Sequence, residues 1–522
     1  MARSSIGVKY VPELLLLLII IIGAILRFYN YSAFSLSNDE LSALSRLRFP
    51  SFSSLIAGGI MIDGHPAGVQ VFLYYWVKLF GNSAASVRLP FVLCGILSIP
   101  AMYYLAGSWF NKSTAILSAA AIAVLQFPIL YSQIARPYSF GLLFSLLFLI
   151  MWTKVTFVRD EGVSYRSWIY KYAGMVITAS LCMYTHYFAF LLAVVVLGTG
   201  IFFISKHLLF RYLIAFLTTL ILYLPHLEIF LSHISIGGVG GTGGWLGVPD
   251  RDSFEDLIEF IFNGSDLIYY TFWGICIGFF VYYRKKISLS RYHLLAILFF
   301  VVPFSIAYCY SHLVNPVLQE PVFLFYTPFL LMFVFAFVPN WTNRYIQFAT
   351  LTLVIGVGLY STIWENQFYK KAHFTEFRGL ADGIAGFIDE MGDENIAKTI
   401  NINHPYYIQY YFDKMEREVE FDMYQINDPA LLSEFADKVN SSDKPYHVHA
   451  FSNVYNPPEV EQIIMVNYPY ILDKDTFLNS GVAYYSQLPK GQKLLEPSYE
   501  MKHGFETMKF DGDLYLNSDE LA

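Results

Sequence analysis

Residues Val11–Leu26 read VPELLLLLIIIIGAIL, an almost wholly apolar run near the start of the chain. The run follows the basic residues Arg3 and Lys9, an arrangement that a secretory signal peptide shares. No small-residue cleavage site comes after it, however, and many further apolar segments do. We therefore predict an uncleaved first membrane span.

The composition also indicates that the chain is a membrane protein. Of its 522 residues, 56% are hydrophobic and only 14% are charged, whereas soluble domains carry about 25% charged residues. About eleven segments are apolar and long enough to cross roughly 30 Å of hydrocarbon. They lie near residues 11–28, 86–107, 113–131, 138–157, 169–185, 187–205, 208–229, 264–283, 292–311, 322–340 and 345–364. The sequence therefore predicts a polytopic α-helical membrane protein.

Basic residues lie in every second loop between these segments, and the N-terminus belongs to the same set. Because loops rich in Lys and Arg stay in the cytoplasm, we expect the N-terminus there and the first long loop, residues 29–85, on the outer side. Residues 67–80 are apolar but too short to cross, and counting them as a span would invert every later assignment. We expect this segment to lie along the membrane interface or to dip in and return.

The last part of the chain differs in charge. From residue 370 onward, Asp and Glu outnumber Lys and Arg by 26 to 13, whereas the preceding part carries 21 basic and 15 acidic residues. We therefore divide the chain into a membrane region, residues 1–365, and a water-soluble tail, residues 366–522, that lies on the outer side. Nucleic acid is an unsuitable partner for a domain of this charge and location.

Amphipathic helices and β-rich runs alternate in the tail, which predicts a small C-terminal extracytoplasmic α/β domain. Helices are expected near residues 374–391, 404–414, 428–439 and 457–468, and strands over Ala397–Ile402, Glu418–Phe421, Tyr446–Phe451 and Val482–Gln487. Such a domain can position an acceptor, bind a partner or simply cap the membrane region. All four cysteines lie in apolar segments outside the tail, which fits a bacterial inner membrane with a periplasmic tail better than an endoplasmic reticulum.

Two adjacent carboxylates, Asp39 and Glu40, follow the first span in the stretch LSNDEL. Asp39 can be a cap for a helix that begins at Glu40, or a functional group at the membrane face. Further polar side chains are predicted at the same face: Asp63, His65, Arg88, Gln133, Arg136, Tyr138, His186, His226, Glu228, His312 and Glu320. A carboxylate there can accept a proton from a hydroxyl while Arg or His neutralises a leaving phosphate, which suits transfer from a lipid phosphate to an alcohol.

Other binding motifs are weak. The glycine-rich run at residues 237–244 lacks the Lys and Ser/Thr of a phosphate-binding P-loop, so we interpret it as an outer linker or as a lid over bound substrate. The adjacent Asp39 and Glu40 make a poor cage for a divalent cation, and His186 and His312 lack the spacing of metal ligands. We therefore favour a site without metal or other cofactor, with a divalent cation at Asp39 and Glu40 as the alternative.

Four short motifs occur in order: Asn38-Asp39-Glu40, Gly64-His65-Pro66, Ser86–Pro90 (SVRLP) and Ser132–Ser139 (SQIARPYS). Their order, spacing and predicted topology resemble the GT-C class of integral membrane glycosyltransferases. The resemblance is to the branch that contains protein O-mannosyltransferases and the aminoarabinose transferase of lipid A. It covers about residues 10–365.

The resemblance implies an inverting transfer of a sugar from a polyprenyl-phosphate donor to a hydroxyl on a protein, lipid or glycan. It makes Asp39 the base that activates this hydroxyl and Glu40 a partner carboxylate that orients the acceptor or holds the local helix. It places His65 toward the donor phosphate, and it places Arg136 and Tyr138 where they contact phosphate or sugar.

One departure from the family pattern concerns the donor phosphate. Pro321-Val322 stands where similar proteins commonly carry an Arg-Tyr pair. Either Arg88, Lys78 or Arg136 compensates for the missing Arg, or donor handling differs, or activity is lost. A milder departure is Ala67, which replaces the second Pro of the usual His-Pro-Pro.

Two alternatives to an enzyme stay open. A transporter of lipid-linked sugar would carry ionisable groups near the middle of its spans and paired broken helices, whereas the predicted groups gather at one face. A non-catalytic relative that binds lipid-linked sugar or scaffolds an assembly is favoured by Pro321-Val322.

Overall fold

The computed structural model describes residues 11–157, 165–237, 246–285, 288–340, 344–426 and 429–489, and short strands at 492–493, 498–502, 505–509 and 515–517. The chain divides into two compact units. The helical unit comprises Met1–Ala33 and Arg46–Lys371, and the sheet unit comprises Phe34–Ser45 and Ala372–Ala522. The short segment Phe34–Ser45 thus groups with the tail, although the sequence places it in the first loop of the membrane region.

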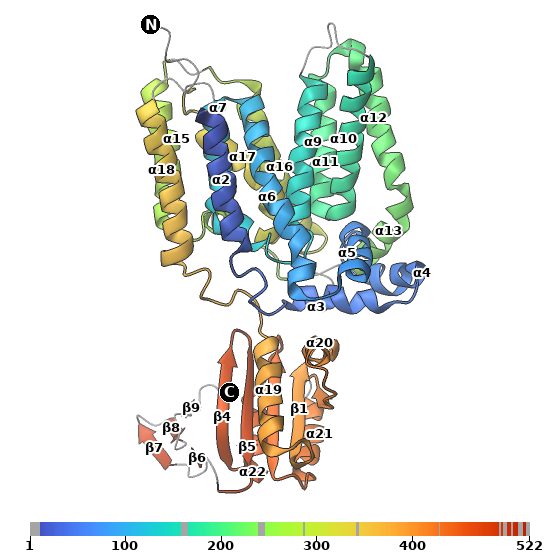
Figure 1. The fold of residues 1–522 in the computed structure, drawn as a ribbon, viewed down its shortest axis with the longest axis vertical. Coiled ribbons are helices and arrows are strands. Elements are labelled where there is room, and N and C mark those ends of the chain that lie inside the picture. Colours follow the sequence, from blue (N-terminus) through green and yellow to red (C-terminus); the bar gives the residue numbers. More distant parts are fainter. Residues whose placement is uncertain are drawn as a thin grey trace. The chain divides into compact units, whose positions relative to one another are not determined.

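The long helices of the helical unit form two groups, which Figure 1 shows. The first group contains α2 (Val11–Phe28), α6 (Ala84–Trp109), α7 (Lys112–Val124), α15 (Asp266–Tyr283), α17 (Thr327–Phe335) and α18 (Arg344–Tyr360). The second contains α9 (Tyr138–Thr156), α10 (Tyr165–Thr185), α11 (Tyr187–Phe203) and α12 (Leu209–Tyr223). The two groups are joined where α6 packs on α9, and where α16 (Arg291–Leu313) packs on both α11 and α17. Shorter helices are α4 (Phe52–Leu55), α5 (Ala67–Phe80), α8 (Gln126–Leu130), α13 (Leu227–Ile236) and α14 (Ser253–Ile261).

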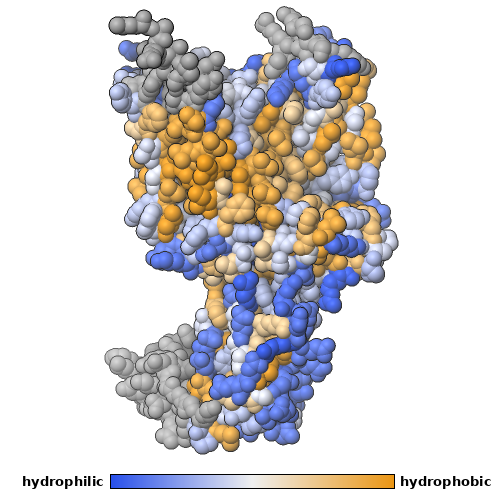
Figure 2. All heavy atoms as spheres, in the orientation of Figure 1, coloured by the Kyte–Doolittle hydropathy of each residue, from blue (hydrophilic) through white to orange (hydrophobic). Residues whose placement is uncertain are grey.

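Each of the eleven predicted spans coincides with helical structure, although some consist of two pieces. The span predicted at 113–131 is interrupted at Leu125, and the one predicted at 322–340 starts as a 3₁₀ helix over Glu320–Phe325. Among the described residues, five helices are long and apolar enough to cross a membrane, or six if the bent pair α14–α15 counts as one. Figure 2 shows hydrophobic residues gathered in a broad belt on the helical unit, as expected of a lipid-facing surface. The chain is a multi-pass membrane protein.

Local sequence explains where several helices begin and bend. Ser83, Asn111 and Ser265 accept hydrogen bonds from backbone N–H groups in the first turns of α6, α7 and α15. The helices α14 and α15 meet at 91°, and the break contains Asn263 and Gly264 with positive φ angles of 64° and 59°. Left-handed residues end a helix because they turn the chain away from its axis, and Ser265 then starts the next one.

The short apolar segment is a separate helix, α5, whose bounds match the prediction. Its 14 residues extend about 21 Å, which is less than the roughly 30 Å of a hydrocarbon core. Gly81 ends this helix with a φ of 76°, a conformation that favours glycine. The helix packs on α6 and α10 and on the preceding loop, so the rest of the helical unit holds it in place.

The sheet unit contains a six-stranded sheet with the order β2-β1-β3-β5-β4-β6. Its strands are β1 (Ile396–Ile402), β2 (Asp422–Tyr424), β3 (Tyr446–Ser452), β4 (Tyr470–Phe477), β5 (Ser480–Ser486) and β6 (Gln492–Lys493). The strand β1 runs parallel to β2 and β3, whereas β5 is antiparallel to β3 and β4. The helices are α3 (Asn38–Ser45), α19 (Arg378–Met391), α20 (Tyr406–Lys414), α21 (Pro429–Asn440) and α22 (Pro458–Asn467). Three further strands, β7 (Ser498–Lys502), β8 (Phe505–Lys509) and β9 (Tyr515–Asn517), form a second sheet.

The predicted α/β class of the tail is confirmed, with two corrections among its strands. The strand predicted at Glu418–Phe421 is wrong, because β2 begins at Asp422 and pairs there with Thr399 of β1. The strand β4 is absent from the predicted set, because its sequence YILDKDTF is charged and half of it is exposed. It forms because it pairs along its length with the buried strand β5, so tertiary context overrides local propensity.

Candidate functional site

The predicted catalytic carboxylates lie in the first turn of α3, and they have different surroundings. The N–H of Ser37 donates to Glu40 Oε2 at 2.9 Å, and the N–H of Glu40 donates to Ser37 Oγ at 3.2 Å. This reciprocal pair is a capping box, which satisfies two backbone donors that a helix start leaves open. Glu40 is 1% exposed, whereas Asp39 is exposed. The interpretation of Asp39 as the helix cap is wrong, because Asp39 lies inside α3 and Ser37 and Glu40 cap it.

In the helical unit, side chains from three segments form a charged chain of contacts. Arg46 Nη1 lies 3.0 Å from Asp63 Oδ2, and His65 Nδ1 lies 3.4 Å from Asp63 Oδ1. Arg136 Nη2 lies 3.1 Å from His65 Nε2. Arg46 follows α3, Asp63 and His65 precede α5, and Arg136 precedes α9, so residues far apart in the sequence converge here. Of the predicted site residues, the structure thus brings His65 and Arg136 together.

The neighbouring side chains set the ionisation of the carboxyl in this chain. Arg136 Nη2 lies 3.3 Å from His65 Nδ1 as well as 3.1 Å from Nε2, so this guanidinium contacts both ring nitrogens of His65. Burial opposes ionisation of Asp63, but His65, Arg46 and Arg136 together hold the pKa of its carboxyl well below the usual value. Asp63 is therefore a fixed negative charge that orients the His65 ring toward Arg136.

Aromatic rings extend from this charged chain into the helical unit. The His186 ring lies 5.7 Å from the His65 ring and 6.0 Å from the Tyr138 ring. Tyr138 in turn packs against Tyr131 at 4.6 Å, and Phe325 packs against His186 at 5.2 Å. His186 Nδ1 also accepts the N–H of a residue in the first turn of α11, so the ring orientation of His186 is fixed. Tyr138 is therefore linked to His65 through the His186 ring, in a buried aromatic cluster.

The loop that carries Asp63 and His65 is held on both sides by histidines. His233 Nε2 lies 2.7 Å from the Ile60 carbonyl, and Tyr187 bonds to the other ring nitrogen of His233 at 2.6 Å. On the far side, the Ala67 N–H donates to His226 Nε2 at 2.9 Å. These contacts come from α11 and from the helical segment that ends in α13, so these two segments position the loop.

Arg88 is buried on α6, and its Nη1 donates to the Tyr31 carbonyl at 3.0 Å. One donor of this guanidinium thus holds the chain that leaves α2. The stretch that departs from the family pattern lies in the 3₁₀ helix before α17, where Val322 is 4% exposed. Val322 supplies no charge, and the nearby Phe325 ring faces His186 instead. Apolar packing therefore occupies this place.

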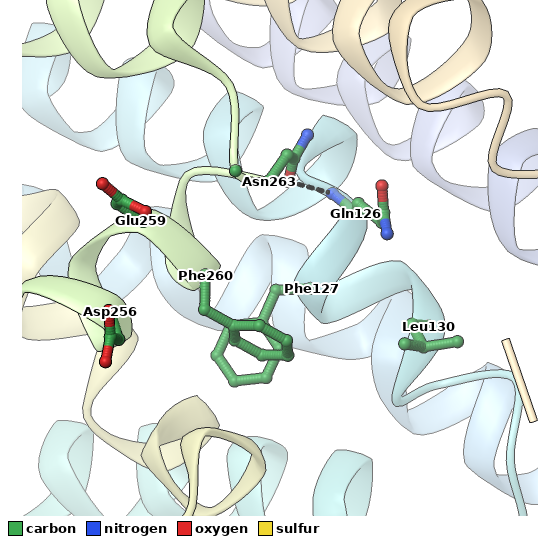
Figure 3. Close-up of a pocket in the computed structure, with 8 residues that line it drawn as sticks. Gln126, Phe127, Leu130, Asp256, Glu259, Phe260 and Asn263 are labelled. Carbon is green, nitrogen blue, oxygen red and sulfur yellow. Dashed lines mark hydrogen bonds between the residues drawn. The ribbon is translucent and has the colours of Figure 1, made fainter. Parts of the chain in front are cut away.

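A separate pocket of about 330 Å³ lies where the helix breaks α7–α8 and α14–α15 meet (Figure 3). The Gln126 N–H donates to Asn263 Oδ1 at 2.8 Å, and the rings of Phe127 and Phe260 meet edge to face at 4.9 Å. The carboxylates of the pocket come from the exposed face of α14. We interpret this place as a joint between two broken helices.

Two predictions about other sites concern a lid and a metal. The predicted linker or lid at residues 237–244 lies outside the described residues, except for Gly237, which ends α13 with a φ of 80°. In the part of the chain that the structure describes, no three His, Cys, Asp or Glu side chains are arranged to hold a metal ion. Metal independence stays a prediction.

Sequence reasoning identified Asp63 only as one of several polar residues at this face, and it did not identify Arg46. The only signal for Arg46 is a positive charge in the loop that follows Asp39 and Glu40. Its partner Asp63 is 17 positions away, and no pattern in the sequence links the two.

Comparisons with known proteins agree with this architecture. Residues 64–231 match the family model described as dolichyl-phosphate-mannose-protein mannosyltransferase. This range includes His65, Arg88, Arg136 and Tyr138, and it begins after Asp39 and Glu40. A comparison with curated protein sequences gives no match.

Solved structures extend the likeness over most of the chain. ArnT from Cupriavidus metallidurans in the apo state superposes with a TM-score of 0.56 at 11% identity, covering 94% of this chain and 100% of ArnT. The same protein bound to undecaprenyl phosphate gives a TM-score of 0.52 at 10% identity, with the same coverage. The apo oligosaccharyltransferase of Archaeoglobus fulgidus gives 0.49 at 12% identity, covering 93% of this chain and 75% of that one. The chain has the GT-C fold of ArnT, and its residues 64–231 resemble the protein mannosyltransferases of the same class.

Proposed function

We propose that this protein transfers a sugar from a polyprenyl-phosphate donor to a hydroxyl of a protein, lipid or glycan at the outer face of a bacterial inner membrane. The likeness to ArnT, which has been solved with undecaprenyl phosphate, makes this lipid the first carrier to test. The N-terminus is then cytoplasmic and the sheet unit periplasmic. The reaction requires neither a nucleotide nor a metal.

The observation that carries the proposal is the contact between Arg136 and His65, held in place by Asp63 and Arg46. Guanidinium groups bind phosphate through paired N–H donors, and such preorganised donors stabilise the negative charge of a leaving phosphate. Because the charges of Arg46 and Asp63 cancel, the Arg136 guanidinium leaves a net positive charge at this place, which suits an anion. Arg88 is a second buried cation in the same unit, and it can take the place of the Arg missing at Pro321-Val322.

The chemical step needs a base as well as a phosphate site. The acceptor hydroxyl oxygen attacks the anomeric carbon of the sugar, the bond to the phosphate oxygen breaks, and the polyprenyl phosphate leaves with the electron pair. Asp39 takes the proton of the hydroxyl, since this residue is exposed and an acceptor can reach it. Attack opposite the leaving group inverts the anomeric centre. Glu40 supports this step by holding the start of α3.

The test is transfer in lipid nanodiscs, with labelled undecaprenyl-phosphate sugars as donors and a membrane extract as the source of acceptor. Wild-type protein is compared with Asp39→Asn, which removes the base without a change of size. The matched control is Asp266→Asn, because Asp266 is likewise exposed in the first turn of a helix. We expect transfer to fall at least about a hundredfold in Asp39→Asn and to persist in the control.

Other outcomes identify the alternatives. Donor binding without transfer by the wild type, with Asp39→Asn indistinguishable from it, supports a non-catalytic protein that binds lipid-linked sugar. Movement of labelled lipid between leaflets without transfer supports a transporter. Either result overturns the proposal.

A further inference from the structure

The segment that leads into α3 is fastened to the sheet unit by hydrogen bonds that join distant parts of the sequence. The Leu36 N–H donates to the hydroxyl of Tyr411 at 2.7 Å, and Ser35 Oγ lies 3.0 Å from the same hydroxyl. Tyr411 belongs to α20, and α20 packs on α3. Ser35, Leu36 and Tyr411 are each 5% exposed or less, so water does not compete for these groups.

The Ser35 hydroxyl also contacts the start of α19. Its Oγ accepts the N–H groups of Phe377 at 3.1 Å and Arg378 at 3.2 Å, at the start of α19. A helix start leaves such donors without partners inside the helix. Because these two N–H groups occupy both lone pairs of the Ser35 hydroxyl, its own hydrogen points to Tyr411 or to the Leu36 carbonyl. One hydroxyl group therefore links α19, α20 and the entry to α3.

Aromatic side chains pack around these hydrogen bonds. The Phe34 ring lies 6.4 Å from the His373 ring, and the Phe377 ring lies 5.6 Å from Tyr407 of α20. The Arg378 guanidinium lies 5.9 Å from the centre of the Tyr411 ring. The three segments that carry these residues thus form a packed junction within the sheet unit, which we call the anchor.

The anchored residue Leu36 precedes Asp39 by three positions, and the Ser37–Glu40 capping box fixes the helical turn between them. The backbone at Asp39 is therefore constrained from both sides of the helix start. A catalytic base must meet its substrate within hydrogen-bond reach, and a displacement of about 1 Å can reduce the rate by about a hundredfold.

We infer that Tyr411, with Ser35 as its bridge, is a positioning residue for the sugar transfer. The hydroxyl of Tyr411 fixes the entry of α3, so that Asp39 is presented to the acceptor in one orientation. The inference rests on the proposed function of Asp39. It also gives the tail a specific task, since the domain at the end of the chain holds the predicted base near its beginning.

The experiment compares Tyr411→Phe with Tyr468→Phe in the full-length protein in nanodiscs. Tyr468 is buried in the core of the same unit, and its hydroxyl donates to the Lys444 carbonyl at 3.1 Å, so both variants lose one buried hydroxyl. We expect amide exchange at Leu36 and in the first turn of α3 to be about fivefold faster in Tyr411→Phe and unchanged in Tyr468→Phe. We expect kcat to fall about tenfold or more in Tyr411→Phe, with donor Kd unchanged.

Ser35→Ala is the second variant, and we expect it to show both effects because it removes the bridging hydroxyl. Unchanged amide exchange at Leu36 in Tyr411→Phe overturns the inference even if the wild type is active. Faster exchange with unchanged kcat overturns it too, because the anchor would then be structural only. Absence of transfer by the wild type is a different failure, which counts against the proposed function and leaves the exchange measurement to decide whether the anchor exists.

Discussion

Ser37 and Glu40 close the start of α3 by exchanging hydrogen bonds, with the Glu40 carboxylate on the Ser37 N–H and the Ser37 hydroxyl on the Glu40 N–H. The neighbouring Asp39 does not take part in this exchange. Two adjacent acidic residues that look equivalent in the sequence therefore have different surroundings, and we propose that they have different tasks.

The first prediction separates these tasks. Gln can replace Glu in a capping box, so Glu40→Gln should leave the stability of α3 unchanged. The rate of sugar transfer should stay within about threefold of the wild type. Glu40→Ala removes the cap and should cost about 1 kcal/mol of helix stability, read as faster amide exchange in α3. Loss of transfer in Glu40→Gln as severe as that in Asp39→Asn would instead make the Glu40 carboxylate part of the chemistry.

The second prediction concerns the donor phosphate. Arg136→Gln should raise the Kd for undecaprenyl phosphate by at least about tenfold, because it removes a buried cation that pairs with the anion. The Kd of Arg136→Lys should lie between those of Arg136→Gln and the wild type. Lys keeps the charge but lacks the planar guanidinium with its paired N–H donors. Binding is measured at one salt concentration, with the exposed Arg284→Gln as control. Equal affinity in Arg136→Gln and the control would exclude Arg136 from the donor site.

The third prediction is a pH dependence at Asp63. The folded-state pKa of Asp63 lies below its unfolded value of about 3.9, so the ionised carboxylate stabilises the fold at every pH above about 4. This contribution is lost as the pH falls through the folded-state pKa. Asp63→Asn should therefore cost about 2 kcal/mol at pH 7, and the difference from the wild type should shrink below pH 4.

Tryptophan fluorescence can follow unfolding of the helical unit, because all eight tryptophans precede residue 366. The control variant is Asp266→Asn, which removes an exposed carboxylate from a helix start in the same unit. We expect this control to stay within about 0.5 kcal/mol of the wild type, since an exposed charge in a first turn contributes little. Equal thermal unfolding of Asp63→Asn and the wild type at pH 7 would contradict the prediction.

The fourth prediction concerns the sheet unit. His447 and His449 of β3 share Thr399 Oγ1 of β1, each at 2.9 Å, and both imidazoles are buried. Burial lowers the pKa of His447 to about 3 and that of His449 to about 4. These values lie below the unfolded value of about 6.5, so the unfolded state binds more protons and stability falls as the pH drops below 6.5.

The slope for each imidazole is about 1.4 kcal/mol per pH unit between its two pKa values. His447→Gln should reduce the slope of the unfolding free energy against pH by the contribution of one imidazole. The exposed His404→Gln should leave this slope unchanged. Amide exchange in β3 between pH 4 and 7 measures the effect. An unchanged slope in His447→Gln would show that this ring does not titrate on unfolding.

Local sequence predicts much of the fold because it depends on patterns within one segment. Apolar runs define the helices of the membrane region, and α5 has the predicted bounds because Pro66 and Gly81 delimit its apolar run. Strand β4 could not be predicted in this way, because its charged sequence is ordered by pairing with β5. The boundary of the units shows the same limit, since Phe34–Ser45 groups with a domain that follows hundreds of residues later.

The candidate site shows the same distinction between what local sequence predicts and what tertiary structure adds. The motifs indicate His65, Arg136 and Asp39, because ionisable groups at membrane depth are costly and usually functional. The partners of such residues are not visible in the sequence: Arg46 meets Asp63, and Tyr411 meets Leu36, across gaps that carry no pattern. Local sequence determined which segments enter the membrane and where the ionisable groups lie. Only the tertiary structure decided which groups pair, because a hydrogen bond depends on distance in space, and packing of the whole chain sets that distance.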